Sequence, residues 1–288
     1  MKFALRYCNL GPYVDPARAL ELVQAGEEAG FESAWTVEHT VVPKGYESAY
    51  PYSPSGRMSK TDDLPIPDPL IWLAYVAAGT SRIKLGTAIL ILPQHNPVIT
   101  AKQVATLDHL SGGRMLLGIG VGWMKEEFDA IGAEFETRGR RTDEYVAAMR
   151  ELWSSDEPTF DGEFVKFTSA YCLPQPVNKR VPIIVGGDSK VAARRAGRLG
   201  DGYFPARGAP DELFSLARQS AAEHDRDPDD LELTASLPED PDDIPRLAAM
   251  GVSRITVPVS AMVGAGQAID SPEGALKWRD TIEKYADL

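Results

Sequence analysis

The chain has 288 residues and 43% of them are hydrophobic, which is enough for a sizeable core in one large domain or two ordinary ones. Its formal net charge is −12 and no run of Lys or Arg interrupts it, so nucleic acid and anionic membrane surfaces are not expected as partners. Cys8 and Cys172 match no metal-ligand spacing, which predicts no metal site and a reducing, cytoplasmic location. The sequence pattern indicates neither a signal peptide nor a membrane span.

The first elements predict a unit of strand, helix and strand. Residues 3–8 form a short apolar strand, and helical spacing of apolar residues follows over 16–29, where Asp15 caps the helix and Gly30 ends it. A second strand over 33–37 leads directly into Glu38 and His39. Repetition of this unit predicts parallel strands joined by right-handed crossovers.

A long segment over residues 41–69 follows the second strand. It is rich in Pro, Ser, Tyr and Gly and is too long for an ordinary barrel connection, so we interpret it as an active-site loop that closes over substrate. The alternation resumes with a helix over 68–79 and a strand over 83–92. The next helix is capped by Asn96, opened by Pro97 and ended by Gly112.

The remaining pattern completes eight strands. It predicts strands over 115–120, 182–187, 202–206, 231–237 and 254–259, helices over 138–153, 190–199 and 274–285, and a hairpin inserted over 159–168. Eight strands that alternate with helices, without a linker or a shift in composition, predict a closed (β/α)8 barrel. The whole chain, residues 1–288, is expected to form this single domain.

Barrel enzymes place their reactive groups at the carboxyl ends of the strands, and three of those ends are unusual here. The first is Glu38-His39, in which the histidine can donate a proton or a hydrogen bond near neutral pH. The third is Gly186-Gly187-Asp188-Ser189, whose glycines allow close approach of a phosphate to a helix N-terminus. A plain turn with Asp188 or Ser189 as helix cap explains the same residues.

Between these two ends lies the glycine-rich segment 118–123. Its glycines at 118, 120 and 122 do not form a dinucleotide fingerprint, because the third falls too early and Trp123 follows it. We interpret them as a strand end that lies flat against a planar ring, although a strand bulge explains at least two of them. Glu126 and Glu127, which come next, are interpreted as acidic residues that favour a helix N-terminus. His95, His109, His224 and Cys8 are assigned no role in catalysis.

At these positions the chain resembles the luciferase-like monooxygenase superfamily, whose members are (β/α)8 barrels that use FMN or the deazaflavin coenzyme F420. The matching motifs occur in one order, at residues 25–35, 38–39, 85–88, 96–97, 112–114, 118–123 and 186–189. The acid-histidine pair after the second strand and the Gly-Trp pair after the fourth are most similar to the F420-dependent oxidoreductases. Coenzyme F420 is therefore expected in preference to FMN.

The resemblance implies that His39 is catalytic and lies near the reactive carbon of the cofactor. It also implies a cis peptide between Ala88 and Ile89, whose bulge supports the ring, and a phosphate held by residues 186–189. The implied cofactor-binding residues are Glu38, His39, Ala88, Ile89, Gly120, Val121, Gly122, Gly186, Gly187, Asp188 and Ser189.

The function expected on this basis is hydride transfer between F420 and a small organic substrate. An apolar or aromatic substrate fits the side chains of Trp123, Tyr46, Tyr50, Tyr52 and Met58. Two alternatives stay open, namely an FMN-dependent monooxygenase that works with a partner flavin reductase and a non-catalytic flavin-binding barrel. Cations on the long loop could attract the acidic tail of F420; they are Lys44, Arg57 and Lys60. Pairing through exposed helices into a homodimer is also expected.

Overall fold

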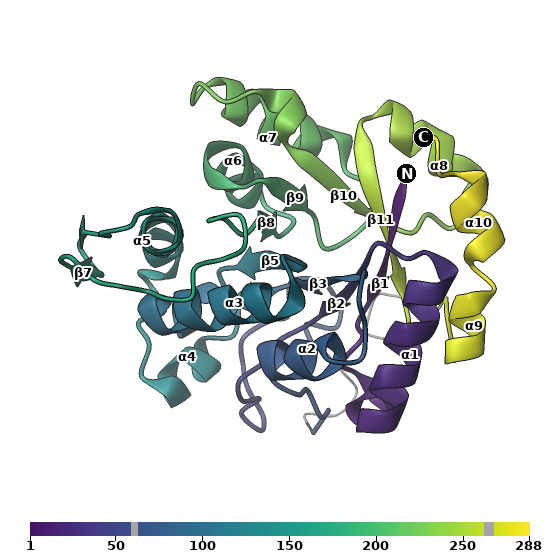
Figure 1. The fold of residues 1–288 in the computed structure, drawn as a ribbon, viewed down its shortest axis with the longest axis horizontal. Coiled ribbons are helices and arrows are strands. Elements are labelled where there is room, and N and C mark those ends of the chain that lie inside the picture. The colour runs from purple at the N-terminus through teal and green to yellow at the C-terminus, as the bar shows by residue number, and fades with distance from the viewer. Residues whose placement is uncertain (59–62, 262–267) are drawn as a thin grey trace.

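A computed structural model describes residues 1–58, 63–261 and 268–288. Parallel strands form a closed barrel with helices packed around it (Figure 1). The barrel strands are β1 Lys2–Arg6, β2 Ser33–Thr36, β3 Lys84–Thr87, β4 Leu90–Ile91, β5 Met115–Gly120, β8 Ile183–Gly186, β9 Gly202–Phe204, β10 Glu232–Ser236 and β11 Val252–Pro258. β3 and β4 together occupy one strand position of the barrel, and we call each such position a stave. The barrel therefore has the eight staves of a (β/α)8 fold, as predicted.

Two pairings close the barrel and join distant parts of the chain. β1 pairs with β11, with Lys2 opposite Arg254, and β3 pairs with β5, with Leu85 opposite Met115. The predicted hairpin is also present as β6 Phe160–Asp161 and β7 Lys166–Phe167, which pair antiparallel outside the barrel.

The helices follow the prediction in part. They are α1 Pro16–Ala29, α2 Pro69–Ala77, α3 Pro97–Ser111, α4 Lys125–Ile131, α5 Arg138–Ser154, α6 Lys190–Leu199, α7 Asp211–Ala222, α8 Ile244–Ala249, α9 Pro272–Leu276 and α10 Arg279–Lys284, with short 3-10 turns at Gly11–Val14, Leu92–Gln94, Pro228–Asp230 and Pro241–Asp243. The single last helix predicted over 274–285 is wrong, because the chain breaks it into α9 and α10. No helix was expected at α7 or α8, whereas α4 begins where Glu126 and Glu127 indicated a helix N-terminus.

The strand predicted over 83–92 is also wrong as one continuous element. Gly86 of β3 pairs with Leu116 of β5, and Leu90 of β4 pairs with Ile119 of β5. Between these two pairs the β3–β4 segment therefore contains one residue more than β5. That extra residue forms a bulge between β3 and β4. The peptide bond between Ala88 and Ile89 within the bulge is cis, as the resemblance implied.

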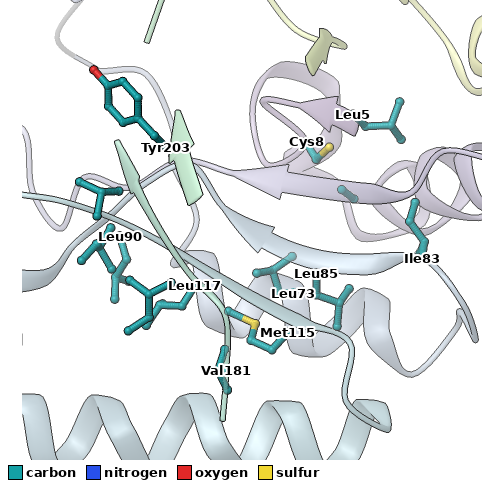
Figure 2. Packing of buried hydrophobic residues seen from close by; sticks show 14 of the residues in the cluster. Leu5, Cys8, Leu73, Ile83, Leu85, Leu90, Met115, Leu117, Val181 and Tyr203 are labelled. Atoms are coloured by element: carbon teal, nitrogen blue, oxygen red, sulfur yellow. The ribbon is translucent and has the colours of Figure 1, made fainter. Parts of the chain in front are cut away.

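The core has two layers. Apolar residues between strands and helices form the larger one, in which Leu85 of β3 and Met115 of β5 lie close to Leu73 of α2 (Figure 2). Inside the barrel, a smaller cluster surrounds the fully buried ring of Trp35. Gly86 leaves room for that ring, because a Cβ there would lie 2.7 Å from it. The barrel is therefore a packed core, and a site can form only at its ends.

No helix in the described part of the chain is long and apolar enough to cross a membrane.

Candidate active site

A cavity of about 1230 Å³ opens at the carboxyl ends of the strands. The cavity is lined by part of the long loop, by the first turns of α5 and α6, and by residues at or just after the strand ends. These strands are β1, β2, β4, β5, β8, β9, β10 and β11. Its volume exceeds the range that usually holds one drug-sized ligand, about 300–1,000 Å³, so a cofactor and a substrate can fit side by side.

His39 lies in the wall of this cavity and is held there by Glu127. Its Nδ1 is 3.0 Å from Oε2 of Glu127, and the two side chains are 8% and 1% exposed. An ionised carboxylate can only accept, so the hydrogen of the ring stands on Nδ1 and leaves Nε2 open. Nε2 makes no hydrogen bond to the described residues. His39 can therefore accept a proton at Nε2, or donate one when the ring is charged.

The carboxylates at the start of α4 hold the long loop in place. Oε1 of Glu127 accepts from the amide of Thr40 at 2.6 Å, and Oε1 of Glu126 accepts from the amides of Glu47 and Ser48 at 2.7 and 3.0 Å. Hydrogen bonds from the Ser48 side chain and these amides lower the pKa of Glu126 to about 2. Both residues do occupy the first turn of α4, as predicted. Their interpretation as helix-favouring acids alone was incomplete, because Glu127 also orients His39.

Glu38 supports the bulge from the neighbouring strand end. One of its oxygens accepts from the amide of Ile91 at 2.5 Å, and the other lies 2.8 Å from Nε2 of His95. Burial alone would lower the pKa of His95, but the hydrogen bond and charge of Glu38 outweigh it and raise the pKa. Glu38 lines the cavity, yet both of its oxygens are engaged by the chain. Its role in cofactor binding stays a prediction.

Glycines within β5 and at the end of β8 make room for the bulge. A Cβ on Gly118 would lie 1.8 Å from the carbonyl oxygen of Thr87, and Cβ atoms on Gly120 and Gly186 would lie 2.6 and 2.5 Å from the side chain of Ile89. The glycines thus make room for a bulge in the neighbouring strand, while their own strand pairs with β8 in unbroken register, so a bulge within the glycine series is not what these contacts show. Ala88 and Ile89 line the cavity together with Gly120, Val121 and Gly122, so the residues predicted to border the ring do lie in one cavity wall.

The segment 186–189 forms a cradle at the first turn of α6. Gly187 has φ +126°, a conformation that side chains rarely adopt, and Tyr203 donates to its carbonyl at 2.8 Å. Ser189 caps α6 by accepting from Ala192 at 3.1 Å, which confirms the capping interpretation. The carboxylate of Asp188 instead accepts from the amide of Ala206 at 2.5 Å. The amide of Ala192 is engaged by this cap, so the amides of Lys190 and Val191 are the ones left for an anion in the first turn of α6.

Two arginines line the same cavity as this cradle, Arg138 on α5 and Arg195 further along α6. Arg138, at the first residue of α5, donates to the carbonyl of Phe135 at 2.9 Å, and its buried Nε has no partner among the described residues. Arg195 lies beside it on α6 but is already paired with Asp143 at 2.6 Å. Arg138 stacks on Phe135 but forms no ion pair with the described residues, so its charge is available to an anion bound in this cavity. Sequence reasoning missed it.

An aromatic wall faces the bulge. Trp123 packs edge-on against His39, Tyr46 and Tyr50, with ring centroids 5.8, 5.5 and 5.2 Å apart. Burial raises the pKa of Tyr52 to about 12, so its hydroxyl stays protonated and can donate. Four of the five predicted side chains line the cavity, namely Trp123, Tyr50, Tyr52 and Met58. Tyr46 does not, because it lies behind Trp123 and accepts from the amide of Met58.

Two of the cations predicted on the loop lie in the described residues, and neither is part of the cavity wall. Arg57 donates to the carbonyl of Tyr46 at 2.8 Å, and neither it nor Lys44 is among the described residues that line the cavity. Lys60 lies outside the described residues. Cys8 is fully buried, and burial raises the pKa of its thiol to about 12, which makes it an inert packing residue.

Comparison with known proteins places this site in a family. The family model of the luciferase-like monooxygenases matches residues 5–267. The chain belongs to this family. The resemblance drawn from the sequence motifs is confirmed, and the order of elements fits the (β/α)8 barrel described above.

Its relatives include both named and unnamed proteins. An F420-dependent glucose-6-phosphate dehydrogenase of Mycobacterium avium is 31% identical over 278 residues, which are 93% of this chain and 77% of the relative. An uncharacterized protein of Mycobacterium tuberculosis is 39% identical over 175 residues. That match spans 60% of this chain and 60% of the relative, less than two thirds of its length.

Solved structures have the same fold. An F420-dependent secondary alcohol dehydrogenase, solved with an F420-acetone adduct, superimposes with a TM-score of 0.75 at 18% identity and 98% coverage of both chains. A monooxygenase from Streptomyces bottropensis gives a TM-score of 0.71 at 21% identity, with 99% of this chain and 98% of the other covered. At these identities the likeness establishes the barrel fold alone.

Proposed function

We propose that this chain is an oxidoreductase that uses coenzyme F420 to reduce or oxidise a small organic substrate. The observation that carries the proposal is a single cavity with an oriented histidine on one side and an uncommitted anion cradle on the other. The named relative that spans 93% of this chain supports F420 as the cofactor. When bound, the deazaflavin supplies a ring carbon that takes up or gives up a hydride.

The described residues fit such a cofactor in two places. The wall formed by Ala88, Ile89 and Gly120 to Gly122 offers an apolar surface to a ring system. The amides at the start of α6, together with Arg138, offer hydrogen-bond donors to a phosphate. His39 stands beside the ring wall and exchanges the proton that accompanies hydride transfer. The aromatic wall excludes water from the reacting groups.

Titration of the purified protein with F420 and with FMN, followed by the fluorescence of each cofactor, tests the proposal. We expect micromolar binding of F420 and negligible binding of FMN. The Arg138→Met variant should bind F420 about ten- to a hundredfold more weakly, because a charge-assisted hydrogen bond to the phosphate is lost. Arg140→Met is the matched control on the same helix, since Arg140 is exposed and pairs with Glu163.

The alternatives give different results in the same titration. Preference for FMN would favour a monooxygenase that receives electrons from a partner flavin reductase. Binding of neither cofactor would reject both enzymatic proposals.

We also propose that residues 1–288 act as one cytoplasmic domain. The pairing of β1 with β11 and the hydrogen bond from the amino group of Met1 to the carbonyl of Tyr285, at 3.0 Å, support one domain because they tie both ends of the chain into the barrel. Cys8 and Cys172 are free thiols, as suits a reducing compartment.

A homodimer through the outer faces of α2 and α3 completes the proposal. Ile71 of α2 and Leu110 of α3 are 73% and 78% exposed, and Tyr75 and Ile99 extend the apolar surface on the same helices. Sedimentation of the wild-type protein should give a dimer, and Ile71→Lys with Leu110→Glu should give a monomer. A wild-type monomer at micromolar concentration would reject this interface.

A further inference from the structure

Arg6 is a cavity residue that the proposed function does not use. Arg6 is the last residue of β1 and is 7% exposed. It lines the cavity beside the ends of β9 and β10. Its guanidinium lies between the rings of Tyr7 and Phe204, at 4.5 and 4.7 Å from their centroids. Two rigid aromatic neighbours therefore fix its position in the wall.

The hydrogen bonds of this guanidinium are incomplete. Nη1 donates to the carbonyl of Ala206 at 3.1 Å and to Oγ of Ser236 at 3.3 Å. The buried Nε has no partner, and Nη2 makes no hydrogen bond to the described residues. No carboxylate among those residues forms an ion pair with Arg6. By contrast, Arg195 and Arg207 in the same cavity are paired with Asp143 and Asp188.

A buried cation without an anion is costly in a folded protein, and such charges are normally paired. An arginine that lines a ligand cavity, has no carboxylate partner among the described residues and keeps Nη2 free of hydrogen bonds to them offers a charged donor that a carboxylate accepts. The phosphate cradle at α5 and α6 is built from other residues, so the phosphate of the cofactor does not account for Arg6. The aromatic rings of Tyr50 and Tyr52 line the same cavity and suit a flat, apolar body.

We propose that the substrate of this site is a small aromatic carboxylic acid whose carboxylate binds the guanidinium of Arg6. The inference rests on the proposed function in taking this cavity as the active site, and it names the substrate class that the cavity selects. It narrows the apolar or aromatic substrate expected from the sequence to an organic anion with an aromatic body.

Calorimetric titration with benzoate and with benzamide tests the inference without any cofactor. The two probes have the same shape, but only benzoate is charged. We expect the wild-type protein to bind benzoate about ten- to a hundredfold more tightly than benzamide. Arg6→Met should remove this preference and keep benzamide binding, which also reports an intact cavity. Arg6→Lys should keep part of it, since the charge remains while the planar donors are lost.

The matched control is Arg57→Met, which removes an exposed positive charge outside the cavity and should leave benzoate binding unchanged. Inorganic phosphate should not compete with benzoate. Equal binding of the two probes to the wild-type protein, an unchanged preference in Arg6→Met, or displacement of benzoate by phosphate would each overturn the inference. The F420 titration is independent, so loss of cofactor binding would reject the proposed function and leave the benzoate result standing.

Discussion

Replacement of His39 by Ala should lower kcat by about 10²- to 10⁴-fold, the usual contribution of a positioned acid or base. The Kd for F420 should change little, because the ring wall and the phosphate cradle are built from other residues. Steady-state kinetics, once a substrate has been identified, and cofactor titration measure the two effects separately. His224→Ala is the control, since that histidine is exposed at the end of α7. Unchanged turnover in His39→Ala would remove the proposed proton role.

Glu127 is expected to affect turnover indirectly, because it positions the ring of His39. Glu127→Gln keeps the volume of the side chain but no longer ensures that the hydrogen stands on Nδ1 of His39. Its turnover should fall less than that of His39→Ala. The double variant should be no slower than His39→Ala alone, because Glu127 acts through the ring that is already gone. Additive losses in the double variant would show that Glu127 acts by another route.

The barrel could be predicted from the sequence because each stave is a short apolar run followed by a helix signal. The three strand ends that carry the site could be found for the same reason, since glycines and polar residues interrupt those runs at Glu38, Gly118 and Gly186. The division of this strand at Ala88 was not visible in the apolar pattern, and only the family resemblance implied a bulge at Ala88 and Ile89. A bulge depends on register against the neighbouring strand, and the sequence of one strand does not contain it.

The partners of the site residues could not be predicted, because they come from distant segments. Glu126 and Glu127 are adjacent and chemically alike, and only the packing of the loop after His39 buries the second of them. Arg6 ends a strand that is otherwise mostly apolar, so the sequence pattern indicates a buried strand and gives no role to the charge of Arg6. Its unused donors become evident only when the ends of β9 and β10 are placed beside it.

At the opposite end of the barrel, Arg254→Met should cost about 3–5 kcal/mol of the free energy of unfolding, as expected when one partner of a buried ion pair is removed. The Arg254 side chain is fully buried and donates to both oxygens of Glu32 at 2.9 and 3.0 Å, and it also pairs with Glu232. The substitution leaves both carboxylates without their shared cation. Urea unfolding measures the loss.

The control for this variant is Arg246→Met. Arg246 pairs with Asp243 at 3.3 Å on the exposed side of α8, and such surface pairs contribute about 0–1 kcal/mol. A loss in Arg254→Met no larger than in this control would contradict a structural role for the buried pair.

The effect of Arg254→Met should also depend on pH. Burial alone would raise the pKa of Glu32, but the hydrogen bonds and charge of Arg254 outweigh it and lower the pKa to about 2. Because the folded pKa lies below the ordinary value of 4.5, the contribution of Glu32 is fully present above pH 4.5 and is lost as the pH falls through about 2. The difference in free energy of unfolding between wild type and Arg254→Met should therefore shrink as the pH is lowered from 5 toward 2. A difference that stays constant over this range would mean that the lost stability comes from packing against Trp35, whose ring lies 5.4 Å from the guanidinium, and not from the ion pair.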